Sequence, residues 1–542
     1  MNRLLVLGID GGTFSLIDRL VQNGRMPFLG KLMEGGARGY LRSADPPYTG
    51  PGWSSFMTGT NPGKHSNYDL ERRTLDFKGL EPVGYHTLHG TTIWDLATRA
   101  QKKTVLLNMP VSYPPPAING TVICGALTPS NVRRFTHPES VREEIDSRFG
   151  PYRFDIAWAT YKESERGRLL DDLKSMTEQQ EEVFLWAMER EEWDFAVAVF
   201  VAPDRIQHSL WKWLGVDEPV PADMEWLREK AFSLYARLDK SLERLATAAG
   251  DSSNILVVSD HGFTSLHSRV DMNHVLAEKG YFAFRTGSGA FDIAAKPLHR
   301  LGLRRRHLGK IMRGLGISRS FLDSVESGNR LQGTGSVTDW SKTRAFCILT
   351  NGIHINVKGR EPQGIVTEEE YEPLRDELIA ALEGLTDPST GQTVIHRVQK
   401  REEIYHGPFL EYAPDLMITS FDERYHFYFF PQSHYDHAFN PPGKATGNHA
   451  YDGILIGKGP DIEPGPVEGA GLIDIMPTMC QLLGLPIPED VDGRILSSML
   501  KETALRRETV AMDQNEQAEV SRELSDDERK GLEDRLRGLG YI

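Results

Sequence analysis

Short, uninterrupted apolar runs alternate along the chain with longer stretches whose apolar residues recur at helical spacing. The apolar runs are typical of strands buried on both faces of a sheet, and they cover residues 4–9, 195–202, 255–258 and 454–456. A further strand is predicted at residues 104–108. The amphipathic stretches predict helices over residues 16–33, 178–190 and 224–249. Strands that alternate with helices indicate an α/β fold with a mostly parallel central sheet.

Acidic residues and histidines stand at the ends of these predicted strands. There are six of them: Asp10, Asp204, His208, Asp260, His261 and His449. The first five follow a strand along the chain, and the last precedes one. Ligands of open α/β sheets bind at the carboxyl ends of the strands, so we expect these side chains to meet at one edge. Three carboxylates and three imidazoles are enough to hold two metal ions.

Each pair of these residues, taken alone, has a simpler interpretation. Asp204 and His208 would lie one turn apart on a helix, but an N-capping aspartate beside an unrelated surface histidine fits equally well. Asp260 and His261 point to opposite sides if they continue the strand, so a loop must turn both toward one centre. Otherwise Asp260 is an ordinary turn residue. Only the combination indicates metal, and mixed carboxylate and imidazole ligands suit Zn²⁺, which we favour, or Mn²⁺.

A two-metal site for phosphoryl transfer needs a nucleophile, and Thr49 is the candidate. Two metals about 4 Å apart can activate the nucleophile and stabilise the leaving oxygen. Thr49 lies between Pro47 and Pro51, in a loop rich in proline and glycine that would hold the hydroxyl in place. The alternative is a plain turn threonine. The neighbouring hydroxyls of Ser54, Ser55 and Thr58 are expected to cap the helix that follows this loop.

Composition excludes several classes of protein. The 542 residues carry a formal net charge of −14, which argues against a general nucleic-acid-binding protein. The three cysteines are far apart, so we expect no disulfide framework and a reducing compartment. No apolar run approaches the ~20 residues of a membrane span, and the N-terminus lacks the pattern of a signal peptide. We therefore expect a cytoplasmic protein.

Motifs in a fixed order resemble a known enzyme family. They are GIDG at residues 8–11, PYTGP at 47–51, FMTGTNPGKH at 56–65, PDRIQH at 203–208, SDHG at 259–262, GNH at 447–449 and DIMPT at 474–478. The ordered set resembles the type I phosphodiesterase/nucleotide pyrophosphatase family of the alkaline phosphatase superfamily, from residue 1 to about residue 500. The related sulfatases modify a cysteine or serine in a Cys/Ser-x-Pro-x-Arg motif, and none lies near residue 49.

The resemblance implies a fold, a mechanism and a set of ligands. The fold would be an alkaline-phosphatase-like three-layer αβα sandwich with an inserted cap. Thr49 would attack phosphorus and form a covalent phospho-enzyme intermediate, which water then hydrolyses. The resemblance also assigns the candidate ligands to two metal sites. One metal would be bound by Asp10, Thr49, Asp260 and His261, and the other by Asp204, His208 and His449.

This sequence departs from the family after the threonine. Animal nucleotide pyrophosphatases have Phe-Pro-Asn there, and the asparagine holds a phosphoryl oxygen, whereas this chain has Gly50, Pro51 and Gly52. A backbone N–H of Gly50 or Gly52 could replace that contact. Trp53 and Tyr48 could stack on a base or belong to the core, as could the aromatic-rich residues 421–430. His65 is expected to support a loop rather than bind metal.

Changes in composition and in the apolar pattern along the sequence predict four segments. The core would comprise residues 1–282 and 342–500, interrupted by an inserted cap at residues 283–341, and residues 501–542 would form a charged tail with a helix near 525–539. The cap contains a basic cluster made of Arg300, Arg304, Arg305, Arg306, Lys310 and Arg313. This cluster is either a solvated helix or a lid that attracts an anionic substrate.

The leading hypothesis is a metal-dependent phosphodiesterase or nucleotide pyrophosphatase acting on a small phosphate ester, such as a nucleotide. The first alternative keeps the fold and changes the substrate, to a phosphate monoester or a phosphonate. The second alternative is a binding or regulatory protein that has lost catalysis. The sequence does not indicate the oligomeric state.

Overall fold

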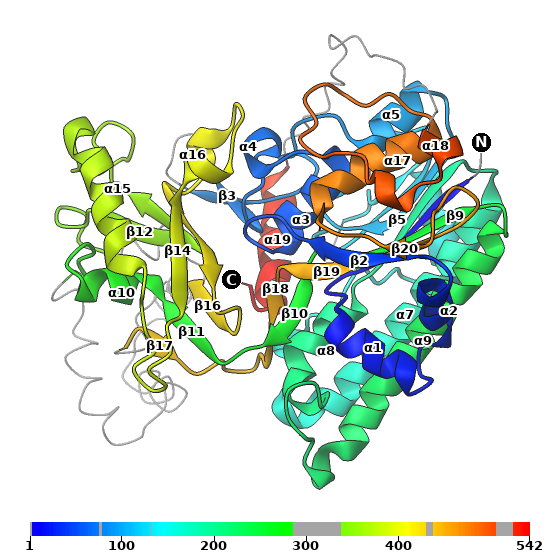
Figure 1. Cartoon of the computed structure of the whole chain (residues 1–542), viewed down its shortest axis with the longest axis horizontal. Coiled ribbons are helices and arrows are strands. Elements are labelled where there is room, and N and C mark those ends of the chain that lie inside the picture. The colour runs from blue at the N-terminus through cyan, green and yellow to red at the C-terminus, as the bar shows by residue number, and fades with distance from the viewer. Residues whose placement is uncertain are drawn as a thin grey trace.

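A ten-stranded, mostly parallel sheet forms the centre of the larger of two lobes (Figure 1). The computed structural model describes residues 3–74, 79–130, 132–285, 338–429, 437–505 and 524–541. The strand order is β20-β2-β19-β9-β1-β8-β5-β6-β7, with β21 beside β2. The four central strands are β9 (Asn254–Val258), β1 (Leu4–Ile9), β8 (Phe195–Phe200) and β5 (Thr104–Met109). Neighbours among these four strands run parallel.

The outer strands of this sheet are shorter or antiparallel. They are β20 (Gly465–Pro466), β21 (Ala470–Gly471), β2 (Ala37–Arg42), β19 (Asp452–Lys458), β6 (Gly120–Cys124) and β7 (Thr136–His137). β19 runs antiparallel to both of its neighbours, β2 and β9. Every residue of β1 is buried because helices cover both faces of the sheet, which explains why its sequence is a continuous apolar run.

Helices cover the two faces of the large sheet, so the lobe has three layers (Figure 1). The helices on one face are α1 (Phe14–Gln22), α2 (Pro27–Glu34), α7 (Arg166–Arg190), α8 (Ala202–Leu210) and α9 (Glu225–Ala249). Those on the other face are α3 (Thr49–Thr58), α5 (Ile93–Arg99) and α17 (Ile475–Leu483). This arrangement confirms the predicted α/β class, with its mostly parallel sheet between layers of helices.

The smaller lobe has its own sheets and its own hydrophobic core. One sheet contains β12 (Ala345–Leu349), β13 (Gly352–Ile355), β15 (Leu416–Phe421) and β14 (Ile395–Lys400), and the other contains β16 (Tyr425–Tyr428), β11 (Ser268–Asp271) and β17 (Phe439–Asn440). The helices of this lobe are α10 (Met272–Glu278), α15 (Glu368–Leu382) and α16 (Arg401–Ile404). Buried residues between positions 345 and 429 pack into this second core, although their sequence had suggested a continuation of the first.

The predicted cap at residues 283–341 lies mostly outside the described residues, and so does its entire basic cluster. Its boundaries and its role therefore stay predictions. A two-stranded ribbon of β10 (Gly262–Ser265) and β18 (Gly447–Ala450) joins the lobes, since β11 of the smaller lobe follows β10 after two residues.

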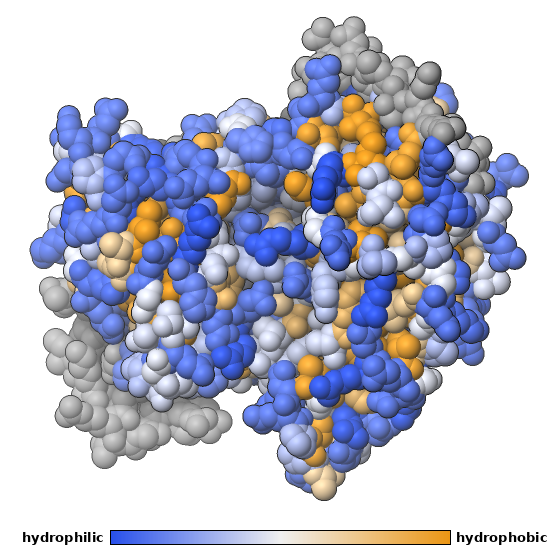
Figure 2. All heavy atoms as spheres, viewed as in Figure 1, coloured by the Kyte–Doolittle hydropathy of each residue, from blue (hydrophilic) through white to orange (hydrophobic). Residues whose placement is uncertain are grey.

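The remaining regular elements are short and lie around the two sheets. They are α4 (Pro62–His65), α6 (Ser140–Phe149), α18 (Glu502–Leu505), β3 (Glu71–Arg73) and β4 (Leu80–Pro82). Turns of 3₁₀ helix occur at Trp158–Thr160, Glu163–Glu165, Trp211–Trp213, Ala222–Met224, Leu410–Tyr412, Leu472–Asp474 and Ser497–Met499. Figure 2, which has the same view as Figure 1, shows mostly hydrophilic side chains on the visible surface of the molecule. Apolar side chains gather there where α17 and α18 lie.

Several predicted elements have different bounds in the structure, and the helix predicted over residues 178–190 already begins at Arg166. The helix predicted over residues 16–33 is two helices, because Gly24 adopts a φ of +68° after α1 and Pro27 begins α2. Thr49 is the first residue of α3 rather than part of the preceding loop. The helix predicted in the tail is α19 (Asp526–Gly538), which begins with a capping box between Ser525 and Glu528. No described helix is long and apolar enough to cross a membrane.

Candidate active site

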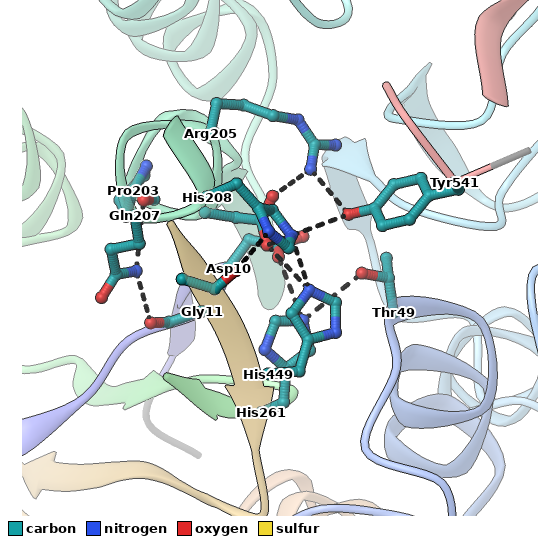
Figure 3. Close-up of polar contacts among 12 residues, drawn as sticks. Asp10, Gly11, Thr49, Pro203, Arg205, Gln207, His208, His261, His449 and Tyr541 are labelled. Carbon is teal, nitrogen blue, oxygen red and sulfur yellow. Dashed lines mark hydrogen bonds and ion pairs between the residues drawn. The ribbon is translucent and has the colours of Figure 1, made fainter. Parts of the chain in front are cut away.

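The six predicted ligands meet in one buried cluster at the carboxyl edge of the central strands (Figure 3). Asp10 directly follows β1, and Asp204 and His208 lie on α8, which follows β8. Asp260 and His261 form the turn between β9 and β10, so both can face one centre, and His449 lies on β18. His208 is the most exposed of the six side chains in the cluster, at 7%. The shared location follows from the parallel packing of β9, β1 and β8.

The candidate ligand atoms fall into two overlapping groups. Within each group, the ligand atoms lie within 4.8 Å of one another. Asp10, Asp260 and His261 make up one, as the sequence predicted, and Asp204, His261 and His449 make up the other. His208, which the sequence assigned beside Asp204, also adjoins this second group. Its Nε2 lies 3.3 Å from Oδ1 of Asp204 and 2.9 Å from Nε2 of His449.

All three histidines present the same ring nitrogen to the cluster. Nδ1 of His208 lies 3.2 Å from the Gly447 carbonyl, Nδ1 of His261 lies 3.1 Å from the Gly262 carbonyl, and Nδ1 of His449 lies 3.1 Å from the Pro47 carbonyl. A carbonyl oxygen only accepts, so each Nδ1 carries the proton and each Nε2 keeps its lone pair for the cluster. Burial also lowers the pKa of His261 and of His449 to about 4, which keeps both rings neutral.

The carboxylates of the cluster include acceptors without donors. Among the described residues, no hydrogen bond reaches Oδ1 of Asp10 or Oδ2 of Asp260, although both atoms are buried. Burial raises the pKa of Asp260 to about 6, and burial with the charges of Asp260 and Asp204 raises the pKa of Asp10 well above its usual range. Buried acceptors that lack donors and lie beside neutral imidazole lone pairs fit a cation. The residues therefore suit divalent metal ions.

Thr49 lies at the cluster with its hydroxyl facing His261. Its Oγ1 is 3.4 Å from Nε2 of His261, and its side chain is buried in the structure. As the first residue of α3, Thr49 also stands at the positive end of the helix dipole, which favours negative charge on its oxygen. The helix therefore supplies the rigidity that the sequence had attributed to the two prolines.

The comparison that decides the family is a match over most of the chain. Residues 4–452 match the family model described as type I phosphodiesterase / nucleotide pyrophosphatase. The chain belongs to this family. It is a phosphoric ester hydrolase of the phosphodiesterase/nucleotide pyrophosphatase type. The matched region includes all six clustered residues and Thr49, but it ends before α17, α18 and α19.

The other comparisons add the following findings. The solved structure of human ectonucleotide pyrophosphatase / phosphodiesterase 5 is similar to this hydrolase, with a TM-score of 0.48 and 13% sequence identity. The similarity covers 89% of this chain and 94% of that chain. A search of curated protein sequences found no significant match.

The structure places the three residues after Thr49 that the sequence of this hydrolase proposed as substrate contacts. Trp53 is fully buried, and its Nε1 donates to Oδ2 of Asp10 over 3.4 Å, so it supports a candidate ligand instead of stacking on a base. The N–H of Gly52 donates to the Tyr48 carbonyl over 2.8 Å, which takes it away from a phosphoryl oxygen. Gly50 lies in the first turn of α3, where N–H groups have no acceptor within the helix. Gly50 therefore stays a candidate for the contact with a phosphoryl oxygen.

The other hydroxyls of α3 serve the structure of the hydrolase. Ser54 Oγ donates to the Gly50 carbonyl and Thr58 Oγ1 donates to the Ser54 carbonyl, so neither caps the N-terminus of α3 as predicted. Ser55 Oγ lies 3.0 Å from Nε2 of His65, whose Nδ1 accepts from the N–H of Asn67. His65 is thus engaged on both ring nitrogens and supports the loop, as its sequence position indicated.

Three residues at the site were not identified from the sequence: Arg205, Asp155 and Tyr541. Arg205 is buried, and its Nε and Nη2 donate to the Asp155 carboxylate over 2.9 and 2.6 Å, while Nη1 donates to Oδ2 of Asp204. Burial raises the pKa of Asp204, but His208 and Arg205 outweigh burial and bring it well below its usual range. Tyr541, near the C-terminus, also reaches the cluster (Figure 3). Arg205 stands inside a family motif, whereas nothing in the sequence of the tail pointed to Tyr541.

A pocket beside the cluster is lined from both lobes. Tyr48 and Tyr541 contribute to it from the larger lobe, and Thr350, His426 and Tyr428 contribute from the smaller one. The ring centroid of Tyr48 lies 4.9 Å from that of His449, so the pocket adjoins the candidate ligands. The aromatic stretch at residues 421–430 contributes both to this pocket and to the core of the smaller lobe. Tyr428 lines the pocket, while other aromatic residues of the stretch belong to the core of the smaller lobe.

Proposed function

We propose that this chain hydrolyses phosphodiesters or nucleotide pyrophosphates, using two divalent metal ions and Thr49 as the nucleophile. One observation carries the proposal. Three histidines face backbone carbonyls with Nδ1 and direct Nε2 into a cluster of buried carboxylates, two of whose oxygens lack donors among the described residues. That arrangement is unfavourable without a cation, because lone pairs and charges face one another in a medium of low polarity.

The residues divide between the two proposed metals as the sequence suggested. Asp10, Asp260, His261 and the Thr49 hydroxyl would hold the first, and Asp204, His208 and His449 would hold the second. Zinc is our preferred ion and manganese the alternative. When bound, the ions would supply Lewis-acid stabilisation of the attacking and leaving oxygens. The ligands' own hydrogen bonds to backbone carbonyls fix their orientation in advance.

Thr49 carries the covalent chemistry in this proposal. Oγ1 forms a bond to phosphorus as the bond from phosphorus to the ester oxygen breaks, and the hydroxyl proton of Thr49 ends on the departing alcohol. Water then attacks phosphorus, the bond to Oγ1 breaks, and the threonine hydroxyl is restored. The position of Thr49 at the start of α3 supports both steps, because the helix dipole stabilises negative charge at that oxygen.

The structure favours a diester over a monoester as the substrate. A monoester carries an additional anionic oxygen, which enzymes usually pair with a cation. Among the described residues, which do not include the basic cluster of the predicted cap, Arg205 is the guanidinium at the six-residue cluster, and its donors are engaged by Asp155 and Asp204. Arg205 therefore holds the candidate ligand Asp204 and does not supply the cation that a monoester would need. We place the ester substituent toward the pocket around Tyr48 and Tyr428, because this pocket lies beside the cluster.

Turnover of bis-p-nitrophenyl phosphate tests the proposed function. We expect purified protein to lose activity when metals are stripped and to regain it with Zn²⁺ or Mn²⁺. Thr49→Ala should lower kcat by at least about 10³-fold, since it removes the nucleophile. Thr58→Ala is the matched control on the same helix, because Thr58 bonds only within its own segment among the described contacts.

Three results would change this proposal. Faster turnover of p-nitrophenyl phosphate than of the diester would favour the monoesterase alternative. Metal binding without turnover of either ester would indicate a narrower substrate, for which phosphonate esters are the next probes. A protein that binds no metal and hydrolyses neither ester would favour the alternative of a binding or regulatory protein.

A further inference from the structure

The C-terminal helix α19 is firmly docked beside the candidate active site. It buries Leu532, Leu536 and Leu539, and it lies near the junction of the two lobes (Figure 1). Tyr113 donates a hydrogen bond to Glu528 at the start of this helix, and Arg535 donates to Ser130 Oγ over 3.1 Å. The chain end therefore has a defined place in the larger lobe.

Two glycines let the end of this helix approach the site closely. A Cβ atom at Gly538 would lie 2.9 Å from Cβ of Ala157, which is closer than real side chains pack. Gly540 adopts a φ of +79°, which turns the chain after the helix, and the N–H of Tyr541 then donates to the Leu536 carbonyl over 3.1 Å. These contacts fix the backbone of Tyr541 and direct its ring inward.

The phenol of Tyr541 meets a ligand atom and a positioning residue at once (Figure 3). Its hydroxyl oxygen accepts a hydrogen bond from Nη1 of Arg205 over 3.1 Å and lies 3.5 Å from Nε2 of His208. The ring also lines the pocket that contains Tyr48 and Tyr428. Tyr541 thus stands between the candidate metal ligands and the space proposed for the ester substituent.

The chemistry of these contacts determines what the hydroxyl can do. A guanidinium only donates, so Arg205 uses an acceptor site of the phenol oxygen and leaves Tyr541 to act toward the cluster as a donor. Nε2 of His208 is the acceptor it faces in the structure. When that nitrogen binds a metal, its lone pair is no longer available to the phenol. An anionic oxygen bound beside His208 would then be the natural acceptor.

We propose that Tyr541 binds the phosphoryl group of the substrate, donating a hydrogen bond from its hydroxyl to a non-bridging oxygen held beside His208. This inference rests on the proposed function, because it assumes that the phosphoryl group binds at the six-residue cluster. It gives the C-terminal helix a direct part in catalysis, although α19 lies outside the residues that match the family.

The test compares the wild-type chain with Tyr541→Phe, which keeps the ring and removes only the hydroxyl. Inorganic phosphate, titrated calorimetrically into zinc-loaded protein, reports binding without turnover. We expect Tyr541→Phe to raise the Kd for phosphate by about tenfold. It should also lower kcat/KM on bis-p-nitrophenyl phosphate by about 10- to 100-fold. The Zn²⁺ affinity and stoichiometry of the metal-free chain should stay unchanged, since the phenol is not a ligand.

Tyr113→Phe is the control for the docking of the helix. It removes the hydrogen bond to Glu528 and leaves the Tyr541 hydroxyl in place. Equal phosphate affinity in Tyr541→Phe and wild type would overturn the inference, and so would an equal loss in Tyr113→Phe, which would assign the effect to helix docking. A wild-type chain that binds phosphate but hydrolyses no ester would contradict the proposed function, while the phosphate titration would still decide the role of Tyr541. A chain that binds neither zinc nor phosphate would overturn both.

Discussion

At the scale of single residues, three buried aspartates share one small volume in different electrostatic states. Asp204 is paired with Arg205, which itself holds Asp155, so its negative charge is stabilised without metal. Asp10 and Asp260 have raised pKa values because burial and neighbouring carboxylates disfavour their charged forms. The metal-free protein is thus destabilised at the first proposed metal position and well paired at the second. The first metal therefore has the larger electrostatic penalty to relieve.

We expect Asp260→Asn to stabilise the metal-free protein at pH 7. An acid whose folded pKa is raised from 3.8 to about 6 binds more protons when folded, so its stabilising effect falls as pH rises through that range. The substitution removes this loss, and the melting temperature of metal-free protein should rise by roughly 2–4 °C at pH 7 but change little at pH 4. Scanning calorimetry of chelator-treated protein at the two pH values measures it.

The same variant should lose the stabilisation that added Zn²⁺ gives the wild type, because the amide supplies a weaker ligand. Asp452→Asn is a useful control, since Asp452 is exposed and lies close in sequence to His449 without joining the cluster. An unchanged or lower melting temperature for metal-free Asp260→Asn at pH 7 would contradict the claim that the charged form of this carboxylate destabilises the metal-free protein.

Some residues of the site could be predicted from the sequence, and others could not. The six clustered side chains could be predicted to meet because strand ends at one sheet edge bring distant positions together by a general rule. The role of Trp53 was left open between base stacking and the core, because a buried aromatic and a stacking aromatic look the same in sequence, and the structure buries it. Tyr541 was missed because its place depends on how α19 packs, and no periodicity in a charged tail reports that.

At the scale of elements, the start of α3 is held by an unusually close contact. A Cβ atom at Gly50 would lie 2.3 Å from the carbonyl oxygen of Asp69, so even alanine would push the first turn of the helix away. That turn carries Thr49. The requirement for glycine after the nucleophile therefore follows from packing as well as from any contact with substrate.

We expect Gly50→Ala to lower kcat/KM on bis-p-nitrophenyl phosphate by about 10- to 100-fold, because a displacement approaching 1 Å misplaces the nucleophile. Metal content should be retained, since six of the seven proposed ligands come from other elements. Steady-state kinetics with metal analysis checks both results. Gly471→Ala is the matched control, as its nearest neighbours would lie at ordinary contact distances of 3.7 and 3.8 Å. Full activity in Gly50→Ala would show that the helix start tolerates movement.

Elements with a continuous pattern were the most predictable. The strand at residues 4–9 is confirmed as β1, and the helix predicted at 224–249 is α9 within one residue. The break between α1 and α2 was not predicted, because the apolar spacing continues across Gly24 and hides the turn. Two hydrophobic cores were also not separable in sequence, since strands of either lobe have the same apolar composition.

At the scale of the whole molecule, a buried charge network secures the smaller lobe. Asp415 is fully buried, accepts from both terminal nitrogens of Arg360 over 2.7 Å, and also accepts from Tyr371 and from the N–H of Ile355. These donors and the charges of Arg360 and Arg401 outweigh burial and hold the pKa of Asp415 well below its usual range. The folded carboxylate therefore contributes stability above pH 4, which is lost only in stronger acid.

Asp415→Asn should lower the free energy of unfolding by roughly 3–5 kcal/mol, because it removes the charge of a fully buried carboxylate that accepts from Arg360, Tyr371 and Ile355. Urea denaturation followed by tryptophan fluorescence and circular dichroism measures the change. Asp376→Asn is the control, since Asp376 pairs with Lys400 over 2.7 Å at an exposed position and should cost less than about 1 kcal/mol. A similar small effect in both variants would show that the network adds little to stability.

The ribbon of β10 and β18 has a consequence for how such a protein can change over evolution. The outgoing and returning segments are hydrogen-bonded neighbours, with Phe263 opposite His449, and the catalytic ligands lie at the base of this stem. A domain whose two ends already lie together can be lengthened, shortened or exchanged without altering its host. A change in the smaller lobe would alter the pocket wall that it supplies, while the six clustered residues, which lie on the larger lobe and the stem, would keep their places.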